Sequence, residues 1–304
     1  MKPTWLCAGY ECLFTIDIDG HVNKLFDGEW FGITRHRNFV WAYCKSKYCV
    51  IKFRVRWNWG QLRLAQVEQW YSRNFFDTHQ VDRIKGHITL ACPVYDKYII
   101  LFGRKPIHYY PLNPGFSKAD EIPKEENNQR HHVNSVFTDG IFVYLMLHNR
   151  WLYAHKHSQL AILDYAKFPT PEVLNIKDLD GADCHNIYVD EGRLVFLDSR
   201  GGRVMLMTVN PFNQWSEVLW RCDRYLRGLS YCDDLIAIGS SKMEKERSQR
   251  VGPGKVHVLD RRTCNEVVTL DVPDTIRDLR RMDRPDRTIS NYRHGPESWD
   301  EPLE

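Results

Sequence analysis

The strongest constraint on the fold is a repeated pattern of short apolar runs separated by hairpin turns. In residues 131–165, runs rich in Val, Ile, Leu, Tyr and Phe are interrupted by Asp-Gly and Asn-Arg pairs. Residues 184–209 repeat this order with turns at Glu-Gly and Gly-Gly pairs. Runs of this length and composition between such pairs are typical of strands joined by tight hairpins. The pattern therefore predicts an all-β protein built from a repeated four-strand unit.

Alignment of the first strand of each unit gives six equivalent positions. They recur at intervals of about 40 to 50 residues, which is the spacing of four-stranded propeller blades. The six positions are His36, His87, His132, His185, Arg227 and Asp278.

The two ends of the chain complete the predicted ring. Little sequence follows Asp278, whereas the amino-terminal segment holds three strands without a partner, TWLCAG, ECLFTIDID and HVNKLF. Pairing them with the carboxy-terminal strand removes exposed strand edges. We therefore predict a six-bladed β-propeller as one domain over residues 1–284, followed by a flexible tail over residues 285–304. Five blades is the alternative if TIRDLRRM is not a strand.

Four of the six first-strand positions are histidines: His36, His87, His132 and His185. The innermost strands of a propeller run roughly along its axis, so equivalent residues meet at one height around the central channel. Neutral imidazole nitrogens suit iron, copper or zinc better than they suit calcium or magnesium. The ring predicts one bound transition metal, with iron favoured and copper or zinc as alternatives.

Arg227 and Asp278 occupy the other two positions of the ring. A guanidinium group binds carboxylate or phosphate in a forked geometry, and a carboxylate can orient a histidine or take a proton. Asn38, Asn134 and Asn186 follow histidines closely and are candidate substrate-binding amides. The leading prediction is a metal-dependent enzyme for a small polar or anionic substrate, with Arg227 and Asp278 catalytic and oxidoreduction favoured.

Three alternatives explain the same histidines differently. The first is a zinc-type hydrolase, and the second is metal-free acid–base catalysis by one histidine paired with Asp278. In the third, the histidines are structural hydrogen-bonding residues, which the Gly86-His87 pair fits, and the propeller binds a ligand or a protein partner at its rim.

Composition excludes several classes of protein. The formal net charge of +3 is too small, and too dispersed, to predict nucleic-acid binding. No stretch reaches the roughly 18 apolar residues of a membrane span, and Glu11 interrupts any signal-peptide core, so we expect a cytoplasmic protein without a membrane partner. Nine cysteines occur without a Cys-x-x-Cys pair. Cys44 and Cys49 flank a predicted turn, and a disulfide across this hairpin is the alternative to the reduced thiols expected in that compartment.

The second half of the chain resembles a family of largely uncharacterised bacterial propeller proteins. The family's motifs are His-x-Asn-Gly-Leu, a histidine followed by Leu-Asp-Ser, Arg-Gly-Leu, and a Val-Gly-x-Ser turn. The matching stretches are His132-Val133-Asn134-Ser135, His185 with Leu197-Asp198-Ser199, Arg227-Gly228-Leu229 and Ile238-Gly239-Ser240-Ser241. Ser135 stands where the family has glycine. The resemblance supports the repeat register over residues 130–282 and implies no particular reaction.

Two groups of metal-bearing propellers offer analogies for the site. The carotenoid-cleaving oxygenases hold iron with four histidines on inner strands, to which the histidine ring here is similar in layout. The lactonase-like six-bladed propellers hold a divalent ion with carboxylate and amide oxygens. The abundance of imidazole favours the first analogy, although fold likeness alone does not fix chemistry.

Overall fold

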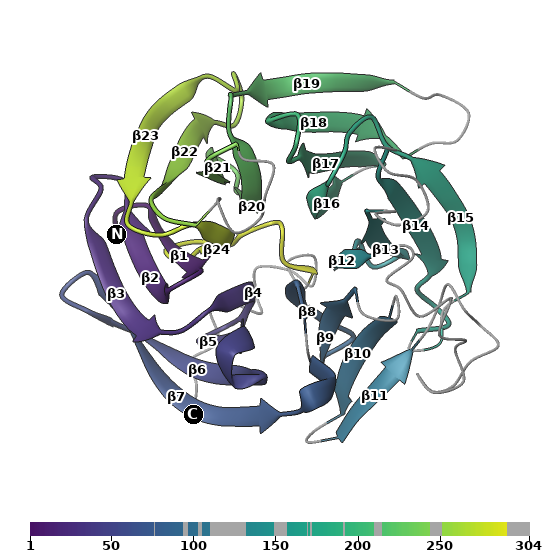
Figure 1. Cartoon of the computed structure of the whole chain (residues 1–304), viewed down its shortest axis with the longest axis horizontal. Helices are drawn as coiled ribbons and strands as arrows, with labels where there is room; N and C mark the ends of the chain where they lie inside the picture. Colours follow the sequence, from purple (N-terminus) through teal and green to yellow (C-terminus); the bar gives the residue numbers. More distant parts are fainter. Residues whose placement is uncertain are drawn as a thin grey trace.

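Six four-stranded antiparallel sheets form a ring in the computed structural model (Figure 1). The structure describes residues 1–75, 77–93, 97–102, 105–109, 132–148, 157–168, 170, 172–190, 192–209, 215–243 and 251–290. Two short 3-10 helices, η1 (Lys45–Lys47) and η2 (Arg73–Phe75), interrupt the strands of these segments. No helix in the described segments is long and apolar enough to cross a membrane. The protein is an all-β, six-bladed β-propeller, as the repeat predicts.

We number the blades around the ring and give the strands of each from the axis outwards. Blade 1 contains β24 (Ile276–Arg281), β1 (Thr4–Gly9), β2 (Cys12–Asp17) and β3 (Val22–Asp27). Blade 2 contains β4 (Trp30–His36), β5 (Phe39–Cys44), β6 (Cys49–Asn58) and β7 (Gln61–Tyr71). Blade 3 contains β8 (Gln80–Ile84), β9 (His87–Cys92), β10 (Lys97–Phe102) and β11 (Lys105–Tyr109).

The other three blades follow the same order. Blade 4 contains β12 (Val133–Thr138), β13 (Phe142–Leu147), β14 (Gln159–Asp164) and β15 (Val173–Asp178). Blade 5 contains β16 (His185–Asp190), β17 (Arg193–Asp198), β18 (Arg203–Thr208) and β19 (Ser216–Arg221). Blade 6 contains β20 (Tyr225–Tyr231), β21 (Leu235–Ser241), β22 (Gly254–Asp260) and β23 (Glu266–Val272).

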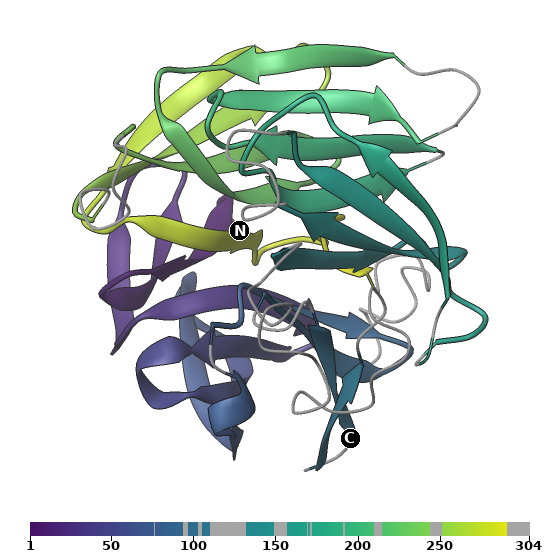
Figure 2. The same cartoon turned by 45° about the vertical axis from the view of Figure 1, so that its right-hand side comes forward.

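The ring closes where the two ends of the chain pair. β24 lies antiparallel to β1, with Trp5 opposite Arg281 and Cys7 opposite Leu279 (Figure 2). TIRDLRRM therefore contains a strand, and the five-bladed alternative is wrong. The carboxy-terminal strand supplies the inner edge of blade 1, so no inner strand is left without a neighbour.

Apolar side chains fill the spaces between adjacent blades. One buried cluster joins blades 4, 5 and 6 and includes Tyr144, Phe196 and Ile238. The inner strand β12 is buried at every residue, whereas the outer strand β19 has no buried residue. Burial therefore decreases from the axis outwards, although the inner strands contain many polar residues, such as Asp82, Arg227 and Asp278, that are buried.

A belt of hydrogen bonds ties neighbouring inner strands together. In each link, a side-chain oxygen of one blade accepts the backbone N–H of the next. The links are Asp278 with Ile33 N at 2.8 Å, Gln80 with Val136 N at 2.9 Å, Ser135 with Asn186 N at 3.0 Å and Asn186 with Gly228 N at 3.0 Å. Such bonds satisfy buried polar groups that have no ladder partner on that side.

The chain continues past β24 into the middle of the ring, which Figure 1 shows in yellow. Asp286, Thr288 and Ile289 are buried there, at 0%, 1% and 1% exposed. The flexible tail that we expected from residue 285 is thus wrong for residues 285–290. The sequence pattern missed this because a short polar segment gains order only by bonding to blades far away in sequence. Residues 291–304 lie outside the described residues.

Candidate functional site

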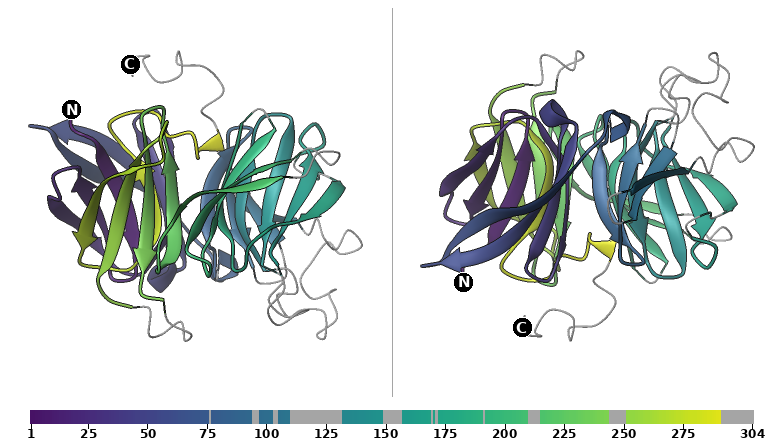
Figure 3. Two further views of the ribbon diagram at one scale, coloured as in Figure 1. Left: turned by 90° about the horizontal axis from the view of Figure 1, so that it is seen from above. Right: turned by 90° about the horizontal axis from the view of Figure 1, so that it is seen from below.

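Each of the six blades sends one side chain to the same end of the ring. Because these side chains lie at or just before the first residues of the six inner strands, all six strands begin at this end, which we call the entry end. The opposite end of the ring is the exit end, and Figure 3 shows the ring from the side. A further histidine, from the end of β13, lies among these six side chains. The entry-end cluster consists of Phe31, His79, His132, His148, His185, Arg227 and Arg277.

Four imidazoles of the cluster form a continuous row from blade 3 to blade 5. The His79 and His132 rings meet edge-on with centroids 5.0 Å apart, and His132 stacks on His148 at 4.9 Å with planes 11° apart. His148 then meets His185 edge-on at 4.6 Å. All four side chains are buried, so their mutual electrostatic effects are screened less than at a surface.

Two guanidinium groups converge on one aromatic ring beside this row. The Cζ atoms of Arg227 and Arg277 lie 5.7 and 5.4 Å from the centre of the Phe31 ring. Phe31 also stacks on His79 at 5.7 Å, and Arg227 Nη2 lies 3.4 Å from His79 Nδ1. A cation over a ring face is attracted by the ring quadrupole, so Phe31 holds both arginines toward the axis.

Backbone irregularities place these side chains. In five blades, the inner strand has a β-bulge near the entry end, where it contains one residue more than the facing part of the second strand. The extra residues are Gly32, Asn134, Asn186, Arg227 or Gly228, and Arg277. His132 and Asn186 also adopt positive φ, at 51° and 55°. Bulges and left-handed residues redirect neighbouring side chains, and they gather next to functional sites.

Glycine is required where two inner strands approach each other closely. A Cβ on Gly32 would lie 2.3 Å from the backbone nitrogen of Val81 in β8. The bulge in β4 therefore brings blade 2 against blade 3. This contact sets Phe31 next to His79.

Electrostatics keep His185 neutral. Burial is the largest cause that lowers its pKa far below 6.5, and the positive charge of Arg227 is the next. The Nδ1 atom lies 2.7 Å from Ser199 Oγ. When Nδ1–H donates to this hydroxyl, Nε2 is the atom that accepts a proton. The Leu-Asp-Ser motif thus supplies the serine that orients His185.

Charged residues also surround the outer side of the cluster. Lys45 Nζ lies 5.3 Å from the centre of the Phe31 ring, and it pairs with Asp77 at 3.4 Å and Glu29 at 3.7 Å. Asp77 also lies 3.6 Å from His79 Nε2. These contacts make a rim of mixed charge around the arginines.

The structure brings together only part of the predicted histidine ring. His132, His185 and Arg227 belong to the entry-end cluster. His36 ends β4, five residues after Phe31, which puts it about 16 Å away toward the exit end. His87 begins β9, the second strand of blade 3, at the hairpin where β8 finishes. His36 and His87 therefore lie at the exit end, and the four imidazoles do not meet.

The other predicted site residues have structural partners. Asp278 accepts hydrogen bonds from Ile33 N and Asn186 Nδ2 and pairs with Arg280 at 2.5 Å. Asn134 Nδ2 contacts His148 Nε2 and donates to Cys184 O at 2.9 Å.

Asn186 also joins blades, whereas Asn38 lies away from the cluster. Asn186 bonds both Gly228 and Asp278 within the belt between blades. Asn38 is exposed in the β4–β5 turn at the exit end. The asparagines that follow His132 and His185 thus join blades, and Asn38 lies away from the cluster.

Sequence reasoning missed four residues of the cluster: Phe31, His79, His148 and Arg277. A signal existed for His79, because it directly precedes β8 as His132 directly precedes β12. The Lys85-Gly86 pair, with φ of 47° and 82°, forms the β8–β9 hairpin turn. Two consecutive positive-φ residues are typical of a type I′ hairpin turn. The Gly86-His87 pair therefore stands at the start of the second strand of the blade, not of its inner strand.

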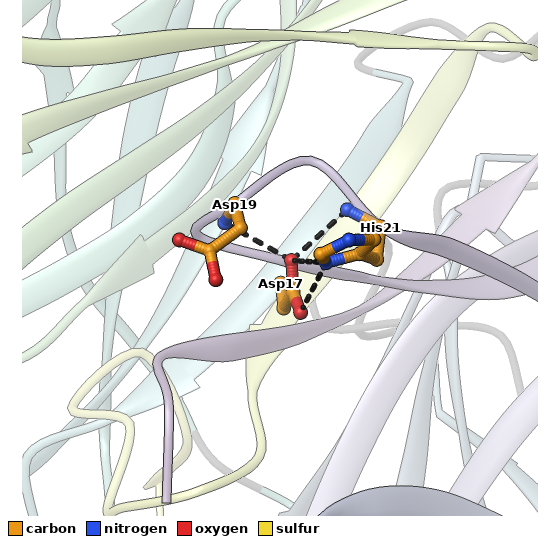
Figure 4. Close-up of side chains that lie close together, drawn as sticks. All are labelled: Asp17, Asp19 and His21. Carbon is orange, nitrogen blue, oxygen red and sulfur yellow. Dashed lines mark hydrogen bonds and ion pairs between the residues drawn. The ribbon is translucent and has the colours of Figure 1, made fainter.

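The cluster is not arranged as a metal centre. Stacked parallel rings such as His132 and His148 direct their nitrogen lone pairs along parallel planes rather than toward one point. Within the described residues, one group of three His, Cys, Asp or Glu side chains has ligand atoms within 4.8 Å of one another: Asp17, Asp19 and His21 (Figure 4).

The Asp17 group is explained by its turn. Asp17 Oδ1 accepts the backbone N–H groups of Asp19 at 3.0 Å and His21 at 2.9 Å. Burial raises the pKa of Asp17, but the hydrogen bonds and charge of His21 and the backbone N–H of Asp19 together outweigh it and leave the pKa below its ordinary value. Lys2 pairs with Asp19. The side chains close the β2–β3 hairpin, as aspartates commonly do in turns.

Comparisons with known proteins support the class of fold. No family model and no curated protein matches the sequence. One similar structure is a chain in the crystal structure of the nidogen/laminin complex. It has a TM-score of 0.58 at 10% identity, over 91% of this chain and 97% of that one. A Bacteroides caccae protein of unknown function has a TM-score of 0.58 at 9% identity, over 93% and 100%.

An enzyme shares the same architecture. The periplasmic gluconolactonase PpgL of Pseudomonas aeruginosa has a TM-score of 0.54 at 11% identity, covering 94% of this chain and all of its own. Bacterial β-propellers are thus among the structures that this chain is similar to. At such identities the likeness shows the fold alone.

Proposed function

We propose that this propeller binds a small organic anion, a carboxylate or a phosphate ester, at the entry-end cluster and acts on it by proton transfer. The observation that supports this is the convergence of one side chain from every blade, with Arg227 and Arg277 packed on one Phe31 ring. Guanidinium groups bind such anions in forked geometry, and burial strengthens the attraction. The close packing of the cluster restricts the ligand to a small group.

The histidine next to Arg227 supplies the chemistry in this proposal. Burial and Arg227 keep His185 neutral, so its free nitrogen can accept a proton, and an anionic group held by the arginines would offset the charge of Arg227 and strengthen the base. Ser199 fixes the orientation of the imidazole at 2.7 Å. His148 packs edge-on against it, and His132 stacks on His148. The site then performs general-base catalysis on an anionic substrate.

A second candidate function follows from the row of four imidazoles. Iron, copper or zinc bound there would make the protein a metal-dependent oxidoreductase or hydrolase. The rings would have to turn first, because His132 and His148 stack in parallel planes. The resemblance of the second half of the chain to a family of uncharacterised bacterial propellers remains a prediction, and it favours neither candidate function.

Calorimetric titration with inorganic phosphate and with malonate tests the anion proposal. We expect one of these probes to bind, and Arg227→Ala to weaken binding at least tenfold, since a charged hydrogen bond contributes about 1.5–3 kcal/mol. Arg63→Ala, an exposed arginine of β7, should leave affinity unchanged.

Elemental analysis of freshly purified protein separates the two candidates. Stoichiometric iron, copper or zinc that is lost in the His132→Ala, His185→Ala double variant would replace the anion proposal by a metal centre. Absence of probe binding, together with absence of metal, would overturn both. Equal affinity of the wild type and Arg227→Ala would overturn the role given to Arg227.

A further inference from the structure

A cleft of about 490 Å³ lies between blades 5 and 6 at the exit end, away from the entry-end cluster. Its volume falls in the range of about 300–1,000 Å³ that small-molecule sites occupy. The lining residues come from strands or turns of both blades: Tyr188, Arg193, Val195, Leu206, Tyr231, Asp233, Arg261 and Arg262.

One wall of the cleft is a stack of flat groups. The rings of Tyr188 and Tyr231 lie 4.7 Å apart with planes 26° apart. The Arg261 guanidinium lies over Tyr231, with Cζ 5.1 Å from the ring centre. Val195 and Leu206 add apolar surface beside the stack. A planar, partly apolar group fits such a wall, because it extends the stack without leaving a gap.

The rim of the cleft is positively charged. Among the described lining residues, three are arginines, Arg193, Arg261 and Arg262, and one, Asp233, is acidic. Asp233 pairs with Arg261 at 3.2 Å. Arg193 and Arg262 are both exposed at the edge of the cleft. Clustered arginines are a recurrent means of binding phosphate groups.

The carboxy-terminal segment holds the two walls together. The Arg287 guanidinium donates to Tyr188 Oη of blade 5 at 3.4 Å and pairs with Asp233 of blade 6. The Arg287 backbone N–H donates to Tyr231 O at 2.8 Å. The same segment is anchored at Asp286, which accepts the backbone N–H of Arg281 at 2.8 Å. The cleft is therefore formed before a ligand arrives, which lowers the entropy cost of binding.

We propose that this cleft binds a mononucleotide. The base packs against the Tyr231–Arg261 stack, and the phosphate lies between Arg193 and Arg262. A free phosphate lacks the flat group that the stack accommodates, and a nucleoside lacks the anion that the arginines bind. The site is separate from the entry-end cluster and does not depend on the function proposed for it.

Calorimetric titration with AMP, adenosine and pyrophosphate tests this proposal on the full chain. We expect AMP to bind with a dissociation constant below about 1 mM, and adenosine and pyrophosphate each to bind at least tenfold more weakly. Arg262→Glu and Arg193→Glu should each weaken AMP binding at least tenfold. Arg221→Glu, which makes the same charge change at an exposed position of β19, should leave it unchanged.

The contrary outcomes are equally specific. Absence of AMP binding at millimolar concentration would overturn the proposal. Equal affinity for pyrophosphate or for adenosine would overturn the assignment to nucleotides. Loss of AMP binding in Arg227→Ala, with retention in Arg262→Glu, would place the nucleotide at the entry-end cluster instead. Circular dichroism of each variant excludes misfolding as the cause of a loss.

Discussion

Asp82 accepts hydrogen bonds from both the backbone N–H of Ser290, at 3.3 Å, and its hydroxyl group, although the two residues are 208 positions apart. Ser290 Oγ also accepts the backbone N–H of Thr138 at 2.9 Å. One serine thus fastens the carboxy-terminal segment to blades 3 and 4. The segment that follows the last strand is therefore part of the ring's internal structure.

Ser290→Ala should destabilise the protein. The change removes the hydroxyl partner of Asp82 and leaves the buried Thr138 N–H without an acceptor, which costs about 1–3 kcal/mol in the free energy of unfolding. Urea denaturation measures this value. Ser216→Ala at the exposed start of β19 is the control. Equal transition midpoints for the two variants would contradict the anchoring role of Ser290.

Asp82→Asn should change how stability depends on pH. Burial raises the pKa of Asp82 from 3.8 to about 6, and the hydrogen bonds from Ser290 offset only part of this effect. Between these pH values the folded protein binds a proton that the unfolded chain does not. The contribution of Asp82 to stability is therefore complete below pH 4 and is lost as the pH rises through 6. The free energy of unfolding falls by about 3 kcal/mol over this range.

Urea denaturation at several pH values between 4 and 7 checks this prediction. The decline in stability over that range should be smaller in Asp82→Asn than in the wild type. The exposed Asp271→Asn should keep the wild-type profile. Parallel profiles for the wild type and Asp82→Asn would show that Asp82 titrates normally in the folded protein.

Asp278→Ala should unfold more easily than the wild type even though Asp278 lies near the proposed site. It leaves Arg280, which is 1% exposed, as a buried charge without its carboxylate partner. Breaking a buried ion pair from one side costs about 3–5 kcal/mol. Asp278→Asn should cost less, because the amide oxygen can still accept from Ile33 N. Thermal unfolding with identical midpoints in all three proteins would contradict a role in joining blades.

Arg227→Ala should raise the pKa of His185. Burial, the larger cause, remains in the variant, so the pKa should still lie below 6.5. The imidazole C–H resonances followed by NMR against pH measure the change. Arg63→Ala provides the control for a lost surface charge. An unchanged titration curve in Arg227→Ala would show that the charge of Arg227 does not lower the pKa of His185.

Cys49→Ala should raise the pKa of Cys44. The two thiols lie directly opposite each other on β5 and β6, and both are free. The hydrogen bond with Cys49 is the main cause that lowers the pKa of Cys44 to about 6, against the effect of burial. Thiolate absorbance against pH measures the shift, with Cys264→Ala as the control. A thiolate transition that stays near pH 6 in Cys49→Ala would contradict this cause.

The blade number followed from local patterns. Hairpin turns and apolar runs act between residues close in sequence, so the periodic spacing was enough to predict six sheets and the closure by β24 and β1. The positions of His132, His185 and Arg227 were also predictable, because each lies at or near the beginning of an inner strand. These three residues do lie together at the entry end.

The membership of the entry-end cluster depended on contacts between distant segments. His87 and His79 both flank strands of blade 3, and only the order of strands from the axis outwards makes His79 the inner one. Phe31 and Arg277 carry no imidazole, and no repeat pattern marks them as neighbours. Packing between blades puts them together, because a bulge at Gly32 allows β4 to approach β8.

Short-range preferences in the chain thus specify strands, turns and their repetition, since each hairpin forms from neighbouring residues. The arrangement around the axis arises when six sheets pack against one another and each buried polar group must find a partner in the next sheet. That requirement directs Asp278, Asn186 and Asn134 into links between blades. It also leaves histidines and arginines from six different strands facing one another.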